Sequence, residues 1–250
     1  MGRMDVWNSF YENPTVVGME WGHERIYAAP SYRLVRFLCD APVTLGECQV
    51  LARWYPLCWR RSDDGLVLVA LRSLLPEGEG HYPENRAPLP LCLQAYPFAV
   101  PDPESIERQQ LVVDRVIADR PTDVGAPIVM ANGRMSTGAV IRARLALQVA
   151  RGLQATTALS RDLDAAGLLE PWPLDFDLGQ GRRAGRSDLS VIAASQLGNP
   201  LLATIVERHG VDAGLFMAYQ RISLFRIGFL LQLAKAGARP EGNAAALELS

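Results

Sequence analysis

Lysine is nearly missing from the chain, and so is a large excess of charge of either sign. Lys235 is the only lysine in 250 residues, and arginine supplies every other side-chain cation. Arginine in place of lysine is typical of a GC-rich coding sequence and is not by itself evidence for anion recognition. The formal net charge is −2, so no overall positive field attracts nucleic acid. We therefore expect no nucleic-acid partner.

Long apolar runs are also missing. The longest, LFRIGFLLQLA at 224–234, contains Arg226 and is much shorter than the roughly 20 residues that cross a bilayer. The first residues, MGRMDVWNSF, lack the apolar core of a secretory signal. These two observations predict a cytoplasmic protein without membrane insertion.

Groups for metal or nucleophilic chemistry are few. His23, His81 and His209 are not clustered in sequence, whereas zinc and iron sites usually combine histidines with carboxylates or cysteines at recognisable spacing. The cysteines form no CxxC pair and lie in apolar segments, which predicts reduced, buried thiols. They are Cys39, Cys48, Cys58 and Cys92. No GxSxG motif is present, and we expect neither a metal nor a cofactor.

A Tyr-Pro pair occurs twice, as Tyr55-Pro56 and Tyr96-Pro97, each inside an apolar run. Proline fixes its own φ and pushes the preceding residue towards extended backbone, so each pair indicates the start of a strand. We expect both tyrosine rings to be buried parts of the framework, with both prolines in the trans form.

Strand signals dominate up to about residue 135. The runs YPLCWRR and LVLVALR flank the turn Ser62-Asp63-Asp64-Gly65, which predicts a β-hairpin. Further strands are expected over 111–117 and 126–130, and a short helix over 45–53 behind the capping box Thr44-Leu45-Gly46-Glu47.

Helix signals dominate after Thr137. Apolar and small residues recur there in steps of three and four, which predicts a helix that ends near Gly167. The face comprises Ile141, Leu145, Val149, Gly152, Thr156, Leu159 and Leu163. Asn199-Pro200 indicates a second helix that ends at Gly210, and a last helix is expected over 212–236.

These patterns predict one compact α+β domain over residues 21–237. Its N-terminal half is expected to be rich in strands and hairpins with short helices, and its C-terminal half to be helical. Residues 1–20 are expected to form a loosely attached leader, and residues 238–250 a frayed tail.

The last helix is apolar nearly all round and contains two arginines, Arg221 and Arg226. Such a helix is usually buried, so an arginine in it must reach solvent or find acceptors. We expect Ile222, Phe225 and Phe229 to pack against the 141–163 helix or the sheet. Structural pairing and a ligand or partner site remain alternatives for both arginines.

Arginines also cluster in GQGRRAG at 179–185, which has a superficial likeness to a dinucleotide-binding loop. The segment before it is a poor strand candidate, so we interpret it as an exposed turn. Arg182, Arg183 and the nearby Arg186 are candidates for binding an anion or an acidic patch of a partner.

Several segments, taken in order over about residues 20–235, resemble the SapC family of bacterial proteins. Both Tyr-Pro pairs fall where the family pattern has them. The chain departs from that pattern at HYPENRAPLP, which leaves the role of the 76–90 loop open. The segments are His23 before the Arg-Ile-Tyr strand, GECQVLARWYPLCW (46–59), LVLVALRSLLPEGEG (66–80), PLCLQAYPF (90–98), LVVDRVI (111–117), ANGRMST (131–137), GLLEPWPLDF (167–176) and the closing block DLSVIAASQLGNPLLATIVERHG…QRISLFRIGFLL (188–231).

The resemblance implies a setting and no established catalytic residues. Relatives commonly accompany TonB-dependent outer-membrane receptors, flavin-dependent halogenase-like proteins and cupin-type oxygenases. One hypothesis is a non-catalytic accessory protein of a surface-nutrient or peptide-modifying system that binds a protein partner or a peptide-like ligand. The alternative is an enzyme acting on a peptide or small metabolite beside a halogenase-like or oxygenase-like partner. Its candidate site residues are His23, Arg60, Tyr96, Arg221 and Ser223.

Overall fold

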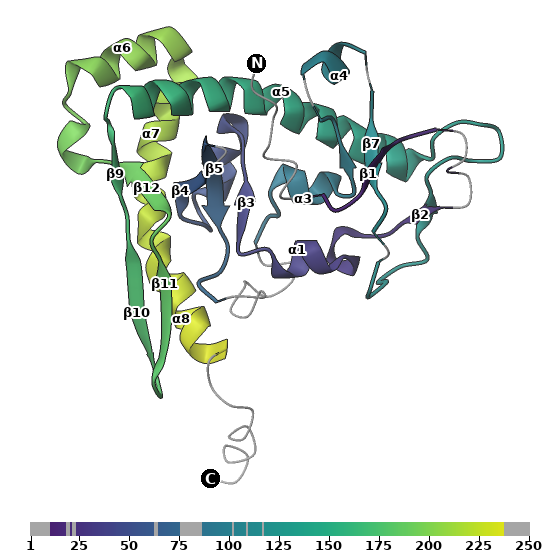
Figure 1. Ribbon diagram of the computed structural model, residues 1–250, viewed down its shortest axis with the longest axis horizontal. Helices are drawn as coiled ribbons and strands as arrows, with labels where there is room; N and C mark the ends of the chain where they lie inside the picture. The colour runs from purple at the N-terminus through teal and green to yellow at the C-terminus, as the bar shows by residue number, and fades with distance from the viewer. Residues whose placement is uncertain are drawn as a thin grey trace.

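A five-stranded antiparallel sheet and one long helix organise the chain in this computed structural model (Figure 1). The structure describes residues 11–18, 21, 24–62, 65–75, 87–101, 103–108, 110–116 and 118–237. The strand order is β3-β5-β4-β12-β9, and every neighbouring pair is antiparallel. The strands are β3 (Asp40–Pro42), β4 (Leu57–Ser62), β5 (Gly65–Leu71), β9 (Leu169–Pro171) and β12 (Leu189–Ile192).

The hairpin predicted from the sequence is confirmed as β4–β5, with Leu57 opposite Ala70 and Ser62 opposite Gly65. Successive side chains of a strand point to opposite faces. Trp59 belongs to one buried cluster and its neighbour Cys58 to another. Because both faces of the sheet are covered, β5 is a continuous apolar run and does not alternate with polar residues.

One face of the sheet packs under helices and the other under a hairpin and a helix. The first face contacts α2 (Cys48–Leu51), α5 (Thr137–Ala165) and α7 (Val211–Ser223). The second face contacts the hairpin of β10 (Leu174–Gly179) and β11 (Arg182–Arg186), together with α8 (Ile227–Gly237). The helix α6 (Pro200–His209) packs on α5 and α7.

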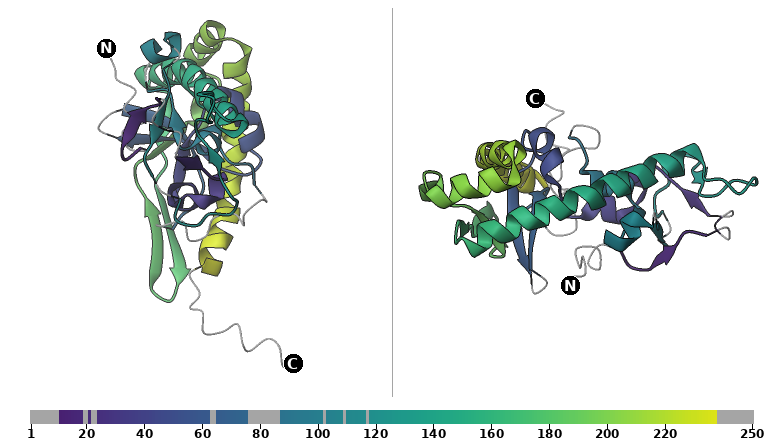
Figure 2. Two further views of the ribbon diagram at one scale, coloured as in Figure 1. Left: turned by 90° about the vertical axis from the view of Figure 1, so that its right-hand side faces the viewer. Right: turned by 90° about the horizontal axis from the view of Figure 1, so that it is seen from above.

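The helix predicted after Thr137 is confirmed as α5, which extends over much of the molecule (Figure 2). The Ser136 hydroxyl accepts a hydrogen bond from Ala139 N at its start. Gly167, with φ +65°, follows its end. Asn199 likewise caps α6, accepting from Leu201 N. In addition to the sheet, α5 contacts α3 (Leu91–Ala95) and α4 (Pro103–Glu107).

The rest of the N-terminal half forms two small antiparallel sheets around α5. One has the order β1-β7-β6 and the other pairs β2 with β8. Their strands are β1 (Pro14–Val16), β2 (Arg25–Ile26), β6 (Phe98–Ala99), β7 (Val112–Asp114) and β8 (Ala126–Pro127), beside the helix α1 (Arg33–Phe37). Short 3-10 turns are η3 (Ala29–Ser31), η4 (Leu45–Glu47), η6 (Ala194–Gln196) and η7 (Leu224–Arg226).

Residues 14–16, which the sequence placed in a leader, pair with β7 as β1. The Asp114 carboxylate anchors the segment before β1, since it accepts hydrogen bonds from Glu12 N at 3.0 Å and Asn13 N at 2.7 Å. The expected tail 238–250 lies outside the described residues.

Both Tyr-Pro tyrosines are buried, as predicted, with Tyr55 3% and Tyr96 1% exposed. Each proline directly precedes a strand, β4 or β6. The predicted trans form is wrong for Pro97, because the Tyr96-Pro97 peptide bond is cis.

The predicted α+β class is confirmed, with strands in the N-terminal half and a helical C-terminal stretch. The second half also contributes four strands, β9 to β12, that periodicity did not reveal. Two of them, β9 and β12, complete the central sheet.

Candidate functional site

The last helix is interrupted by a 3-10 turn, whereas one continuous helix was predicted. It consists of α7, the 3-10 turn η7 and α8, which run one after another past the end of the sheet (Figure 1). The helix α7 packs with the cluster on one face of the sheet, and α8 packs with the cluster on the other. The tighter turn at η7 therefore marks the point where the chain passes the strand ends.

Buried polar residues of α7 satisfy the backbone at this end of the sheet. The Ser223 hydroxyl accepts from Leu57 N at 2.9 Å and donates to Gln220 O at 2.6 Å. The Gln220 amide donates to Leu57 O at 3.1 Å. Gln220 and Ser223 are fully buried. Because unpaired buried backbone groups are costly, these contacts give Ser223, a predicted site residue, a structural role.

The two arginines of this segment lie in different surroundings. Arg221 is half-buried and donates to Ile192 O, at the end of β12, at 3.1 Å. Arg226 is exposed. One arginine therefore supports the sheet end and the other faces solvent.

The prediction that Ile222, Phe225 and Phe229 are packed in the core is wrong. They are 62%, 86% and 40% exposed, and Val211 and Leu215 are also exposed. The side of α7 and α8 that faces the core carries instead a second apolar series, which includes Phe216 and Leu230. The apolar stripe, as we call it, comprises the exposed residues Val211, Leu215, Ala218, Ile222, Phe225 and Phe229.

The apolar stripe is long and follows a regular repeat. Its members step by four and three residues in alternation, so they stay on one side of the helix. Phe229 is 18 positions after Val211, which at a rise of 1.5 Å per residue corresponds to about 27 Å. The sequence contains this spacing, but a helix with two apolar sides does not indicate which side is buried.

Arg60 and Arg186, both predicted site residues, meet at Asp40. The Asp40 carboxylate accepts from Arg60 at 2.8 Å and from Arg186 at 2.9 Å. Arg186 also donates twice to Asp188, at 2.8 Å each. Burial opposes the charge of Arg186, but the hydrogen bonds to Asp188 and the charge of Asp40 raise its pKa. The four groups form an internal ion network that joins β3, β4, β11 and the start of β12.

The GQGRRAG segment is the turn of the β10–β11 hairpin, with Gly179 at φ +85° and Gly181 at φ +76°. No helix follows it, so it is not a dinucleotide-binding loop. Arg183 pairs with Asp175 across the hairpin at 2.5 Å. Arg182 is exposed at the same turn.

Tyr96 lies inside a cluster of three tyrosines. Its ring stacks on Tyr11 at 5.6 Å and meets Tyr32 edge-on at 5.1 Å, measured between ring centroids. Its hydroxyl donates to Asp114 at 3.1 Å. Burial and the charge of Asp114 raise the pKa of Tyr96. A buried, protonated phenol in this setting is a framework element.

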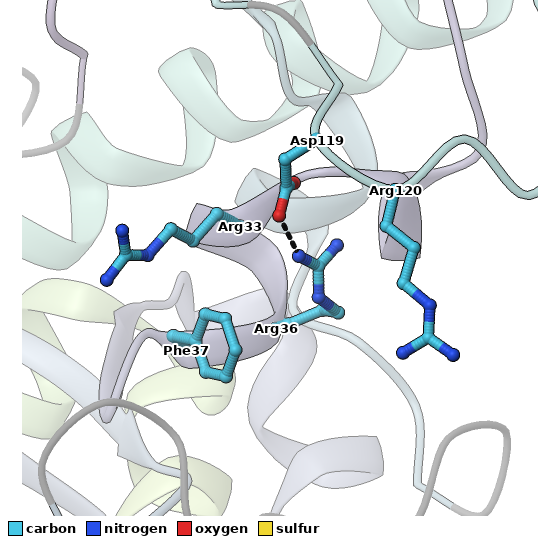
Figure 3. A pocket seen from close by; sticks show the side chains of 5 residues that line it. All are labelled: Arg33, Arg36, Phe37, Asp119 and Arg120. Carbon is cyan, nitrogen blue, oxygen red and sulfur yellow. Dashed lines mark hydrogen bonds and ion pairs between the residues drawn. The ribbon is translucent and has the colours of Figure 1, made fainter.

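A hollow of about 450 Å³ beside α1 carries an excess of positive charge (Figure 3). Arg36 at its centre forms an ion pair with Asp119. The guanidinium groups of Arg33 and Arg120 point in opposite directions from it (Figure 3). Phe37 completes the lining. The cations in this hollow do not converge on one point (Figure 3), and none of the predicted site residues that the structure describes lines it.

A second hollow, of about 350 Å³, is mostly apolar. Among the described residues, no titratable or nucleophilic side chain lines it. Its lining residues are Val16, Val17, Gly18, Gln110, Leu111, Val129, Gly133 and Met135.

The part of the chain that the structure describes contains no assembled group for metal or thiol chemistry. No cluster of three or more His, Cys, Asp or Glu side chains is placed to hold a metal ion among these residues. His209 pairs with Asp162 at 2.9 Å, while His23 and His81 lie outside the described residues. None of the four cysteines forms a disulfide bond. Burial raises the pKa of the Cys48, Cys58 and Cys92 thiols, so they stay protonated at neutral pH.

Within the described ranges, none of the helices combines the length and apolar character needed to cross a bilayer. A family model described as SapC matches residues 19–205, which is most of the chain. No curated protein and no solved structure gives a significant match. Together with the ordered motifs quoted above, the match shows that the chain belongs to the SapC family.

Proposed function

We propose that this chain is a non-catalytic accessory protein that binds a protein partner through the apolar stripe. The observation that carries the proposal is Phe225, which is 86% exposed within a row of exposed apolar residues. Single exposed apolar residues are common, but an exposed apolar row about 27 Å long is typical of an interaction surface. Removal of such side chains from water is favourable by about 25 cal/mol per Å² of apolar surface, and the part that exceeds the entropic cost of association stabilises the complex.

The predicted site residues support binding over catalysis. Tyr96 and Ser223 are buried and have structural hydrogen bonds. Arg60 is committed to an ion pair, and Arg221 to a backbone carbonyl. The four do not converge on either of the hollows described above. His23 lies outside the described residues.

The biological setting of the proposal comes from the family resemblance. We place the protein in the bacterial cytoplasm, as an accessory of a surface-nutrient or peptide-modifying system. A halogenase-like or oxygenase-like enzyme is the partner that this setting favours. The apolar stripe begins at Val211 and so lies beyond residues 19–205, which match the family model.

Affinity capture with stripe variants tests the proposal. Tagged full-length protein is expressed in its host as wild type, as the double variant I222D/F225D and as I141D. Ile141 is a matched control, because it is 53% exposed on α5 and lies outside the stripe. A protein that wild type and I141D retain is then purified, and its affinity for each form is measured by calorimetry.

We expect I222D/F225D to melt at nearly the wild-type temperature and to lose the partner. Equal affinity of the double variant and wild type would contradict the proposal. So would turnover of a substrate that depends on Arg60, Tyr96 or Arg221.

A further inference from the structure

The spacing of the residues in the apolar stripe indicates which kind of secondary-structure element can pack against it. Its steps run four, three, four, three and four from Val211 to Phe229. Steps that alternate between four and three repeat every seven residues, as do the two apolar positions in the seam of a left-handed coiled coil, in which side chains of one helix fit between those of another. The complementary element for such a seam is a second helix.

The charges beside the seam specify the flanks of that helix. Residues 211–237 contain one acidic residue, Asp212, and three basic ones, Arg221, Arg226 and Lys235. Arg221 precedes Ile222 and Arg226 follows Phe225, so the two residues lie on opposite sides of the seam. The Arg221 guanidinium also donates to Ile192 O, whereas Arg226 is exposed. This segment is positive, although the whole chain has a formal net charge of −2.

A second copy of the chain is a poor occupant for this seam. In a parallel pair, Arg221 of one helix faces Arg226 of the other, because these two positions are five residues apart and flank the seam. An antiparallel pair centred on Ile222 and Phe225 gathers all four arginines at one level. Like charges placed together destabilise both arrangements.

We propose that the apolar stripe docks an amphipathic helix of a partner protein, with apolar residues at 3.5-residue spacing flanked by Asp or Glu. This inference rests on the proposed function and names the chemistry of its partner. The acidic flanks pair with the exposed Arg226 and Lys235, and the apolar residues of the partner helix cover Ile222 and Phe225.

Two synthetic peptides test the proposal without knowledge of the natural partner. Both contain four heptads with Leu at the two seam positions, and the flanking positions carry Glu in one peptide and Lys in the other. Binding of each labelled peptide to the full chain is followed by fluorescence anisotropy at low and high salt. We expect the Glu peptide to bind at least about tenfold more tightly than the Lys peptide, a difference of about 1.4 kcal/mol, and to weaken as salt rises.

Variants of this chain distinguish the contribution of the apolar stripe to binding from that of the charges that flank it. I222D/F225D should abolish binding of the Glu peptide, whereas R226E should weaken it and improve binding of the Lys peptide. I141D and R151E, at exposed positions of α5, should leave both affinities unchanged.

Equal binding of the two peptides, or no binding of either, would overturn the inference. Concentration-dependent dimerisation abolished by I222D/F225D would overturn it in favour of a second copy. Sedimentation with anionic phosphatidylserine vesicles in place of peptide binding would overturn it in favour of a membrane surface. If the captured natural partner still depends on Ile222 and Phe225 while the Glu peptide fails, the proposed function stands and the acidic helix does not.

Discussion

Polar residues of α7 form hydrogen bonds with backbone groups at the ends of β4 and β12. Ser223 and Gln220 satisfy both backbone groups of Leu57, and Arg221 satisfies Ile192 O. From the sequence, Arg221 and Ser223 were candidate site residues. The sequence does not contain the position of the strand ends they contact, because that position depends on how α7 passes the sheet.

Removal of the Ser223 hydroxyl tests this structural role. Ser223→Ala leaves the buried Leu57 N–H without its acceptor, so we expect a loss of about 1–3 kcal/mol in the free energy of unfolding. Ser195→Ala, at an exposed position of η6, should change it by less than about 0.5 kcal/mol. Denaturant unfolding of both variants provides the comparison, and equal small effects would remove the role assigned to Ser223.

The ion network around Asp40 predicts a pH dependence. Hydrogen bonds from Arg186 lower the pKa of Asp188 in the folded protein. A lowered folded-state pKa means that the contribution to stability is present above the ordinary carboxyl pKa of about 3.9 and is lost as pH falls through the folded value. Asp188→Asn should therefore reduce stability at pH 7, by about 1 kcal/mol or less because the carboxylate is partly exposed.

The difference between wild type and Asp188→Asn should shrink as pH falls below about 4. Urea unfolding from pH 3 to pH 7 measures it. A difference that keeps its size throughout this range would show that the carboxylate charge does not contribute.

At the scale of elements, the long helix α5 depends on one close approach. At Gly152 a Cβ atom would lie 2.8 Å from Thr44 Cγ2 and 2.9 Å from Thr44 Cβ. The Thr156 hydroxyl, one turn later, donates to Gly152 O at 2.8 Å and accepts from Leu45 N at 3.1 Å. The residue without a side chain therefore lets the 44–47 turn rest directly on the helix.

In Gly152→Ala, the added methyl group should push the 44–47 turn away from α5. Alanine is the better helix former by about 1 kcal/mol, yet we expect a net loss of about 1–3 kcal/mol from overpacking. Gly228→Ala in α8, where nothing lies within 4 Å of the added Cβ, should be neutral or stabilising. Thermal unfolding of the two variants checks this, and a Gly152→Ala protein as stable as Gly228→Ala would contradict the packing.

Elements with a strong local signal were predictable, and those that depend on tertiary contacts were not. The β4–β5 hairpin, α5 and the Asn199 cap of α6 followed from turn residues, periodicity and capping chemistry. The strand β10 alternates the apolar residues Leu174, Phe176 and Leu178 with exposed aspartates, a period-two signal that the sequence analysis missed. The strand β11, RRAGR, contains Ala184 as its one apolar residue and gives no such signal. For the last helix, the predicted bounds were nearly right. The side that was predicted to be buried is exposed, because both sides of the helix are apolar and the sequence does not distinguish them.

For the whole molecule, the central claim is that α7 and α8 bury one apolar side and present the other to solvent. Figure 1 shows these helices running past the central sheet, where Phe216 packs edge-on against Trp59 of β4 at 5.6 Å between ring centroids. Phe225 is only nine residues further along the chain, yet it is 86% exposed, whereas Phe216 is 1% exposed. The two phenylalanines thus form a matched pair.

The most direct measurement is the free energy of unfolding of Phe225→Ala beside that of Phe216→Ala, by urea denaturation of the full chain. We predict a loss of about 3–5 kcal/mol for Phe216→Ala, as for a buried aromatic truncation, and a change within about 0.5 kcal/mol for Phe225→Ala. A loss of similar size for both variants would show that Phe225 is buried in solution, and the apolar stripe would then be part of the core.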